Sequence, residues 1–251
     1  GKVDQQTVND IIDAALDAGV NLIDTADVYQ GGRSEEHLGI ALEGRWDSVV
    51  LATKVYNRTG DGPNDYGASR HHICAGLEAS LRRLGTDHVD LYQIHRWDAT
   101  TPVEETLRAL DDLVSAGKVR YVGASNFTAW QLARANTLAE LLRWTPFATI
   151  QNHYHMLERG LEREMLGCCE AHHVGILPYF PLAGGFLTGK YKRGEPAPAG
   201  SRGESSGYVQ RYMTEGNYTR IEALSAWAEA RDPTMAELAH SWLLAHPQVC
   251  S

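Results

Sequence analysis

Four side chains that can hold, donate or orient a proton follow apolar runs in the first hundred residues. Asp24 ends the run NLI, and Tyr29 follows five residues later. Lys54 follows VVLAT, and His95 follows VDLYQI. An acid, a phenol, an ammonium and an imidazole together suit one chemical step, the protonation of an oxygen while its carbon receives a hydride.

The carboxylate and the ammonium are expected to pair. An acid at the end of a core strand is costly unless something pairs with it, and Lys54 ends the next strand after Asp24. A free phenol has a pKa of about 10, and a nearby ammonium stabilises its phenolate. Lys54 would thereby make Tyr29 a better acid, and His95 would hydrogen-bond the substrate oxygen on which charge develops.

Other polar residues also follow apolar runs. Ser125 and Asn126 end one run, Gln151 and Asn152 the next, and Tyr179 another. Strand ends emerge into water, and this alone explains a single polar residue at such a place. An Asp, a Lys and a His that all follow apolar strands favour a site at one rim.

Helices and strands alternate along the chain and would position these residues. Helical spacing is found over 8–16, from about 34, over 73–84, over 102–117, around 130, over 161–171 and over 234–246. Strand-like runs cover 21–26, 49–55, 89–95, 119–126, 147–155 and 175–182, with the start of another at 248–251. This alternation predicts a parallel sheet. With a missing first strand the runs would make a (β/α)8 TIM barrel, and a doubly wound sheet is the alternative.

The totals suit one domain over residues 1–251. The 251 residues are 43% hydrophobic and 22% charged, and no linker divides them. Residues 184–216 are rich in Gly, Pro and Ser, which predicts a long loop that is either functional or disordered. We expect the segment from Gly184 to about Gly207 to close over a ligand.

Composition also limits partners and location. The net charge of -9 argues against a nucleic-acid partner, and no apolar run is long enough to span a membrane. The four cysteines form no CxxC pair, which favours a reducing cytoplasm. A small carbonyl compound is the expected partner, and the sequence leaves the oligomeric state open.

Three patterns come close to known motifs. The stretch GGFLTGKY nearly matches a P-loop, but Tyr191 stands where a Mg²⁺-binding hydroxyl is required. No GxGxxG opens a helix, so a Rossmann domain is not indicated. The pair His153 and His155 lacks acidic or cysteine partners at ligand spacing, so no metal site is predicted.

Several longer stretches resemble the aldo-keto reductases in that family's order. They are DTADVY with SEEHLG, LATKV, SLRRLGTDHVDLYQIHRWD, GKVRYVGASNF, IQNHYH and YFPLAGGFLTGKY. The long-loop branch, which contains the potassium-channel β subunits and bacterial members, is the most similar. The resemblance implies a (β/α)8 barrel that binds NADP(H) and reduces aldehydes or ketones.

The resemblance also implies roles for individual residues. The catalytic tetrad falls on Asp24, Tyr29, Lys54 and His95, and Asp24 also lies at the cofactor. Contacts to the nicotinamide carboxamide fall on Ser125, Asn126 and Gln151, and Tyr179 takes the position that stacks on the nicotinamide ring. The remaining cofactor-binding positions are Phe180, Pro181, Leu182, Ala183, Gly185, Lys190 and Arg202.

The sequence departs from the family pattern in three places. Many members have a serine where Phe180 stands, so one hydroxyl contact to the phosphates is expected to be absent. The first barrel strand and the C-terminal segment that grips the adenosine phosphate are expected to lie outside the sequence. The choice between NADP and NAD therefore stays open.

The position of two aromatic residues suggests a substrate pocket. Tyr56 follows Lys54, and Trp97 follows His95, so both are candidates to line it. Besides a reductase, two other functions remain open. One is a cofactor-binding partner protein with slow turnover. The other is a Schiff-base aldolase, which needs Lys54 neutral and away from an acid.

Overall fold

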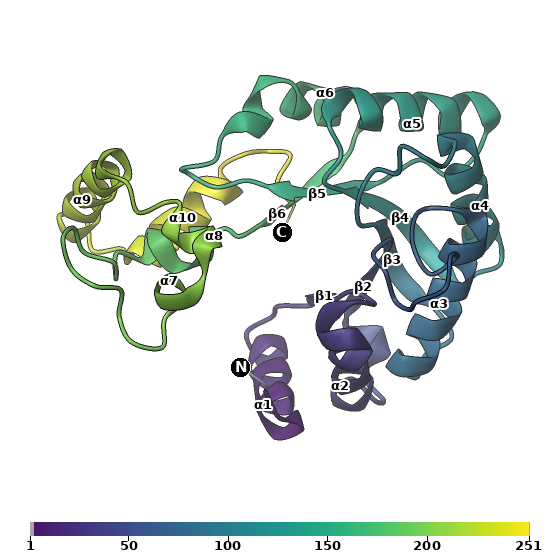
Figure 1. Cartoon of the computed structure of the whole chain (residues 1–251), viewed down its shortest axis with the longest axis horizontal. Helices are drawn as coiled ribbons and strands as arrows, with labels where there is room; N and C mark the ends of the chain where they lie inside the picture. The colour runs from purple at the N-terminus through teal and green to yellow at the C-terminus, as the bar shows by residue number, and fades with distance from the viewer. Residues whose placement is uncertain (1–2, 251) are drawn as a thin grey trace. The chain divides into compact units, whose positions relative to one another are not determined.

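A computed structural model describes residues 3–250 of the chain. The chain divides into two compact units, Gly1–Ile150 and Gln151–Ser251. Figure 1 shows the course of the chain by residue number.

The first unit repeats a strand and a helix. Its elements are α1 (Gln5–Asp17), β1 (Leu22–Asp24), α2 (Arg33–Ala41), β2 (Val50–Val55), α3 (Arg70–Leu84), β3 (Val89–Ile94), α4 (Val103–Ser115), β4 (Val119–Ser125) and α5 (Ala129–Leu142). Short 3-10 turns span Tyr29–Gly32 and Trp46–Ser48. The predicted helices and strands of this part are confirmed, with ends shifted by a few residues.

The strands pair in parallel in the order of the chain. β1 pairs with β2, β2 with β3 and β3 with β4, and the order of the sheet continues through β5 (Thr149–His153) and β6 (Gly175–Tyr179). Sequential order is the order of a (β/α)8 barrel, whereas a doubly wound sheet reverses its order at a switch point. The α/β fold of the (β/α)8 class is therefore confirmed.

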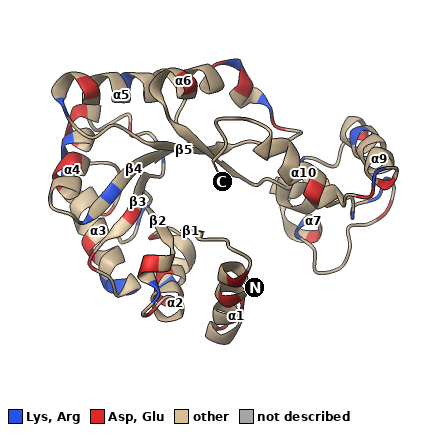
Figure 2. Cartoon of the chain, turned by 180° about the vertical axis from the view of Figure 1, so that it is seen from behind, with Lys and Arg blue, Asp and Glu red and all other residues tan. Residues whose placement is uncertain are grey.

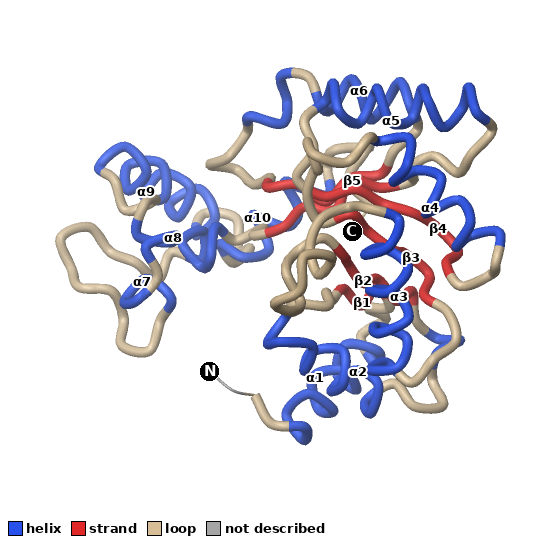
Figure 3. The backbone as a smooth tube through the Cα atoms, turned by 45° about the vertical axis from the view of Figure 1, so that its right-hand side comes forward, coloured by secondary structure: helices blue, strands red, loops and turns tan. Residues whose placement is uncertain are grey.

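Burial explains why β2 and β3 are largely apolar. All six residues of β3 are buried, and β2 is buried after its first residue. Helices cover one side of these strands, and α2, α3, α4 and α5 pack against one another in turn (Figure 3). Because the side chains on both faces of β2 and β3 are buried, these strands do not alternate between polar and apolar residues.

Helix ends follow the signals in the sequence. Ser69 accepts a hydrogen bond from the backbone of His72 at the start of α3, and Gly85 ends this helix with a φ of 71°. Figure 2 shows Lys, Arg, Asp and Glu residues along the helices of the first unit.

The second unit holds the remaining elements. They are α6 (Met165–His172), α7 (Arg202–Ser205), α8 (Gly207–Gln210), α9 (Glu215–Glu229) and α10 (Met235–Leu244), with 3-10 turns at Gly160–Arg163 and Ala183–Thr188. The start of a strand predicted at 248–251 is an isolated parallel bridge between Val249 and Ile176.

The prediction of one long loop over 184–216 is wrong in part. Short helical turns interrupt this segment, and α9 begins at Glu215. The reason is a local apolar cluster of buried side chains. It contains Ala183, Phe186, Leu187, Tyr191, Val209, Tyr212, Ile221 and Ala239.

Candidate functional site

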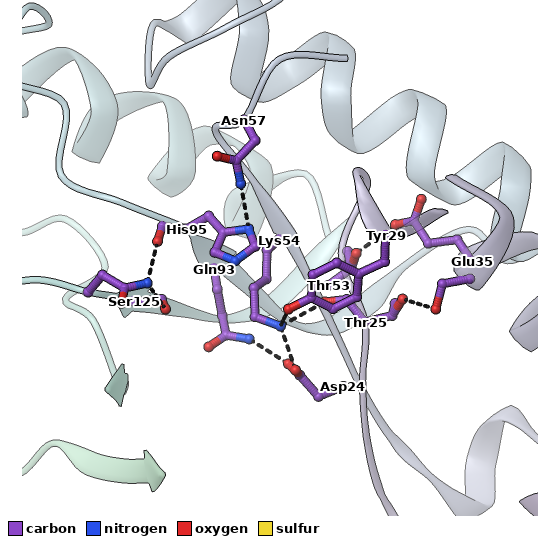
Figure 4. A network of polar contacts seen from close by, with 12 residues as sticks. Asp24, Thr25, Tyr29, Glu35, Thr53, Lys54, Asn57, Gln93, His95 and Ser125 are labelled. Carbon is purple, nitrogen blue, oxygen red and sulfur yellow. Dashed lines mark hydrogen bonds and ion pairs between the residues drawn. The ribbon is translucent and has the colours of Figure 1, made fainter. Parts of the chain in front are cut away.

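The ammonium of Lys54, near the end of β2, is buried and contacts residues at and after the end of β1. The Lys54 side chain is 0% exposed, and its Nζ lies 2.5 Å from Asp24 Oδ2. Nζ also donates to the Thr25 carbonyl oxygen at 2.9 Å and contacts the Tyr29 hydroxyl at 3.4 Å (Figure 4). Three partners match the three hydrogens of an ammonium, so the buried charge is both paired and hydrogen-bonded. The predicted ion pair is confirmed.

A second residue holds the carboxylate in place. Gln93 donates from Nε2 to Asp24 Oδ1 at 3.0 Å, and Gln93 is fully buried. The register of β2 and β3 puts Gln93 beside Lys54. Sequence reasoning missed Gln93, although it lies two residues before His95 and therefore on the same face of its strand.

Tyr29 stands on a tight turn. It begins the 3-10 turn, in which Gln30 and Gly31 have positive φ, and the residue is 39% exposed. Thr25 Oγ1 donates to Ser34 Oγ at 2.8 Å across this turn. The exposed phenol is therefore carried by a short loop that a hydrogen bond between Thr25 and Ser34 closes.

The residues after the turn fix it to the neighbouring elements. Buried Glu35 accepts a hydrogen bond from Thr53 Oγ1 at 2.6 Å and from Arg83 Nε at 2.7 Å. A Cβ at Gly32 would come within 2.9 Å of Arg83 Cδ, and one at Gly39 within 2.7 Å of the Arg83 carbonyl oxygen. The stretches SEEHLG and SLRRLG thus support the turn that carries Tyr29.

His95 is held as a neutral donor. Burial, together with the charges of Lys54 and Arg96, lowers the pKa of His95 to about 4. The Asn57 amide nitrogen lies 3.0 Å from His95 Nδ1. Because an amide nitrogen only donates, Nδ1 accepts and the ring proton is on Nε2. The Tyr29 and His95 rings meet edge to face, with centroids 5.9 Å apart.

Asn57 carried no signal that sequence reasoning used. It stands three residues after Lys54, just beyond β2, in a stretch where the sequence reads as a loop. An amide at such a place is ordinary for loops, so only the fold shows that it orients an imidazole.

The predicted carboxamide contacts of the first unit lie beside His95. Asn126 has a φ of 57°, and its Nδ2 donates to the His95 carbonyl oxygen at 3.0 Å and to Ser125 Oγ at 2.9 Å. Ser125 is 1% exposed. These bonds fix the end of β4 next to the end of β3.

The two predicted pocket residues contact aromatic neighbours. Tyr56 is 8% exposed, and its hydroxyl lies 2.6 Å from that of Tyr66, which is 43% exposed. Burial raises the pKa of Tyr56 to about 12. Trp97 packs edge to face against Phe127 and Trp130, with centroids 5.2 and 5.6 Å apart.

The other predicted cofactor residues belong to the second unit. Gln151 lies in β5 and is 9% exposed, and Tyr179 ends β6. The chain then turns through Phe180, Pro181 and Leu182 into the 3-10 turn at Ala183. Phe180 and Ala183 have positive φ, which is uncommon outside glycine and typical of functional turns.

This turn has the features of a phosphate-binding loop. Gly185 has a φ of 101°, and a Cβ there would lie 3.2 Å from Lys190 Nζ. The ammonium therefore sits against bare backbone, where phosphate oxygens can approach closely. Arg202 is exposed at the first position of α7. These residues fit the diphosphate of a dinucleotide.

Two other classes of site are not indicated. Among residues 3–250, no three His, Cys, Asp or Glu side chains are grouped so as to hold a metal ion. Within the same described range, no helix has the length and apolar character needed to cross a membrane.

Comparison with known proteins gives consistent matches over the whole chain. The sequence profile of the aldo/keto reductase family matches residues 1–251. A protein named "Probable voltage-gated potassium channel subunit beta" from Oryza sativa subsp. japonica is 37% identical, over 100% of this chain and 78% of its own.

Two further relatives have similar identity. The Bacillus subtilis protein "Uncharacterized oxidoreductase YrpG" is 37% identical, over 97% of this chain and 76% of its own. "Versiconal hemiacetal acetate reductase" from Aspergillus parasiticus is 34% identical, over 94% of this chain and 75% of its own.

Proposed function

This chain belongs to the aldo/keto reductase family of oxidoreductases, and we propose that it reduces aldehydes or ketones to alcohols with NADP(H). Members of the family use NAD(P)H. The observation that carries the proposal is the buried Lys54 ammonium, which contacts both the Asp24 carboxylate and the Tyr29 hydroxyl.

The first unit supplies the proton. Tyr29 donates its hydroxyl proton to the carbonyl oxygen of the substrate, and Lys54 stabilises the phenolate that remains. Asp24 keeps Lys54 charged and in place, and Gln93 keeps Asp24 in place. His95 donates from Nε2 to the oxygen as negative charge develops on it.

The cofactor, when bound, supplies the hydride. In the proposed assignment Ser125, Asn126 and Gln151 would bind its carboxamide, Asp24 would lie at the nicotinamide end, and Tyr179 would stack on the ring. The backbone from Phe180 to Gly185, including Pro181, Leu182 and Ala183, would receive the diphosphate, and Lys190 and Arg202 would pair with phosphate oxygens. Tyr56 and Trp97 are the proposed walls of the substrate pocket.

An aldolase that forms a Schiff base is disfavoured by the same contacts. A lysine nucleophile must lose its proton, yet Asp24 lies 2.5 Å from Lys54 Nζ and favours the charged form. We also propose a small carbonyl compound as the partner. A nucleic acid is disfavoured, because the net charge of the chain is -9. The four free cysteines suit a reducing compartment such as the cytoplasm.

The test is cofactor oxidation by the full chain. Absorbance at the reduced-nicotinamide band should fall when NADPH is mixed with members of a panel of aromatic and aliphatic aldehydes and ketones. NADH run in parallel measures the cofactor preference. Failure of every carbonyl compound with both cofactors would overturn the proposal.

A cofactor-binding partner protein is the second candidate. It is favoured by the relative from Oryza sativa, whose name describes a potassium channel β subunit. Tight NADPH binding with very slow oxidation by the whole panel would support this candidate over a metabolic reductase.

A further inference from the structure

One face of Tyr179 is covered by another ring. His153 ends β5 and Tyr179 ends β6, the adjacent strand of the sheet. Their planes differ by 3°, and the ring centroids lie 5.1 Å apart, which is an offset stack. A second planar ring that stacks on Tyr179 therefore takes the opposite face.

The His153 ring is itself fixed at both nitrogens. Nε2 lies 3.2 Å from the Tyr212 hydroxyl and 3.1 Å from His155 Nε2. Nδ1 lies 3.4 Å from the Tyr208 hydroxyl. An imidazole bonded at both ends cannot rotate or flip without losing contacts, so its plane is set.

The proton positions in this group follow from its donors. The Leu157 backbone N–H donates to His155 Nδ1 at 3.2 Å, so His155 carries its proton on Nε2. Two N–H groups repel when they face each other, so His153 Nε2 is the acceptor. His153 therefore carries its proton on Nδ1, which points at Tyr208.

Tyr212 completes the group. The Tyr212 oxygen accepts from Arg211 Nη2 at 2.9 Å and lies 3.2 Å from His155 Nε2, which leaves the Tyr212 proton to point at His153 Nε2. Tyr212 is 5% exposed and His155 is 0% exposed. This buried support makes the orientation of His153 a property of the fold.

The group favours a neutral His153. Burial lowers the pKa of His153, with Glu158 opposing and Arg211 assisting, and it lowers the pKa of His155 to about 3. The oxidised nicotinamide ring is a cation, and an imidazolium behind Tyr179 would repel it. A neutral imidazole supports Tyr179 without that penalty.

We propose that His153 is a positioning residue that backs Tyr179 and thereby sets the plane on which the nicotinamide ring stacks. The inference rests on the proposed function, because it takes Tyr179 as the stacking residue. The His153-x-His155 step of the sequence then has a role in cofactor binding.

The experiment measures NADP⁺ binding to the full chain by quenching of tryptophan fluorescence. His153→Ala removes the stacked ring and should raise the Kd by about two- to tenfold, the range for a lost aromatic pair. His153→Phe keeps a ring and should stay within about twofold of the wild type. His240→Ala is the matched control, because this exposed histidine bonds only its own helix carbonyl among the described contacts, at 2.8 Å.

A second measurement uses the unmutated protein. In ¹⁵N spectra of histidine-labelled protein, His153 should be the Nδ1–H tautomer, and adding NADP⁺ should shift its signals while His240 stays unchanged. This readout does not depend on activity or on the folding of a variant. Melting midpoints of the variants separate a loss of stability, which a purely structural role predicts, from a change in affinity.

The outcomes distinguish the inference from the function on which it rests. If the wild type binds NADP⁺, and Tyr179→Ala weakens binding but His153→Ala does not, the inference fails and the proposed function stands. An Nε2–H tautomer, or no NADP⁺-induced shift at His153, also overturns the inference. If the wild type does not bind NADP⁺ or NADPH, the proposed function fails.

Discussion

The two units hold their candidate functional residues by different kinds of interaction. In the first, an ammonium, a carboxylate and two amides meet at strand ends through directional bonds, with Lys54 0% exposed. In the second, the main contact of the candidate residues is a ring stack, that of His153 on Tyr179, and hydrogen bonds orient the His153 ring.

The difference predicts how each unit responds to damage. Removing one partner of a buried charge leaves the other uncompensated, which is costly. Removing one ring from a stack loses a smaller contribution, about 0.5–1.5 kcal/mol, and leaves no charge unpaired. Substitutions in the first unit should therefore change rates steeply, whereas those in the second should shift affinity gradually.

The largest effect is expected for Tyr29→Phe. The change removes one hydroxyl from an exposed ring and leaves the Asp24–Lys54 pair intact. Carbonyl reduction should fall by about a hundred-fold or more, the scale of a lost general acid. NADP⁺ affinity, read by fluorescence quenching, should change little. Near-wild-type reduction by the variant would remove Tyr29 from the mechanism.

The second-largest loss of rate is expected for Lys54→Met, and its effect should not be independent of that of Tyr29→Phe. The variant loses the cation at 3.4 Å from the Tyr29 hydroxyl, so the proton transfer slows by about ten- to a hundred-fold. In the double variant with Tyr29→Phe, the rate should be close to that of the worse single variant, because both act on one proton. Effects that multiply in steady-state rates would show that the two residues act independently.

Lys190→Met tests whether this lysine of the second unit binds the phosphates of the cofactor. Losing a charge-assisted contact to phosphate should weaken NADP⁺ binding by about tenfold and flatten its dependence on salt. The rate at saturating cofactor should be unchanged. Lys192→Met is the matched control, since Lys192 is also exposed and lies two residues away. Equal affinities for both variants would exclude Lys190 from the cofactor site.

The smallest effect is expected for Asp27, a buried acid of the first unit. Burial and the nearby Glu35 raise the pKa of Asp27 to about 7, and neither carboxyl oxygen has a hydrogen-bond partner of normal geometry among the described residues. Between about pH 4 and 7 the folded state binds a proton that the unfolded state releases, so this group costs stability as the pH rises.

Asp27→Asn removes that titration. Relative to the wild type, the variant should gain about 1–2 kcal/mol of unfolding free energy at pH 8 and much less at pH 5. Urea unfolding at the two pH values measures the difference. The His95 contribution, which has the opposite sign, is present in both proteins and cancels. A gain equal at both pH values would mean that Asp27 does not titrate in this range.

The sequence predicts most of the fold and the charged centre of the site. Apolar runs in the sequence mark the strands, and the polar residue after each run marks its end. A parallel sheet brings these ends to one edge, which predicts that Asp24 and Lys54 meet. Gln93 and Asn57 were missed, because an amide within a strand or loop has no pattern of its own. Their partners are 69 and 38 residues away in the chain.

The second unit was harder to predict. α9 has only Ile221 and Ala228 buried, so its sequence lacks the apolar stripe by which helices are recognised. The helical turns within 184–216 form because Phe186, Tyr191 and Tyr212 pack together, and such packing depends on tertiary contacts. Ring stacking likewise follows from the fold and leaves no spacing rule in the sequence.

The three contacts of Lys54 have a consequence for chemical probing. Its nitrogen is sealed from solvent and directs every hydrogen at a neighbour, so it presents no lone pair to an acylating or aldehyde reagent. Amine-directed labels should mark the exposed Lys190 and Lys192 and leave Lys54 untouched in the native state. An inhibitor aimed at this centre would have to engage the exposed Tyr29 phenol or the Asp24 carboxylate, whose side chain is 32% exposed, because solvent reaches both.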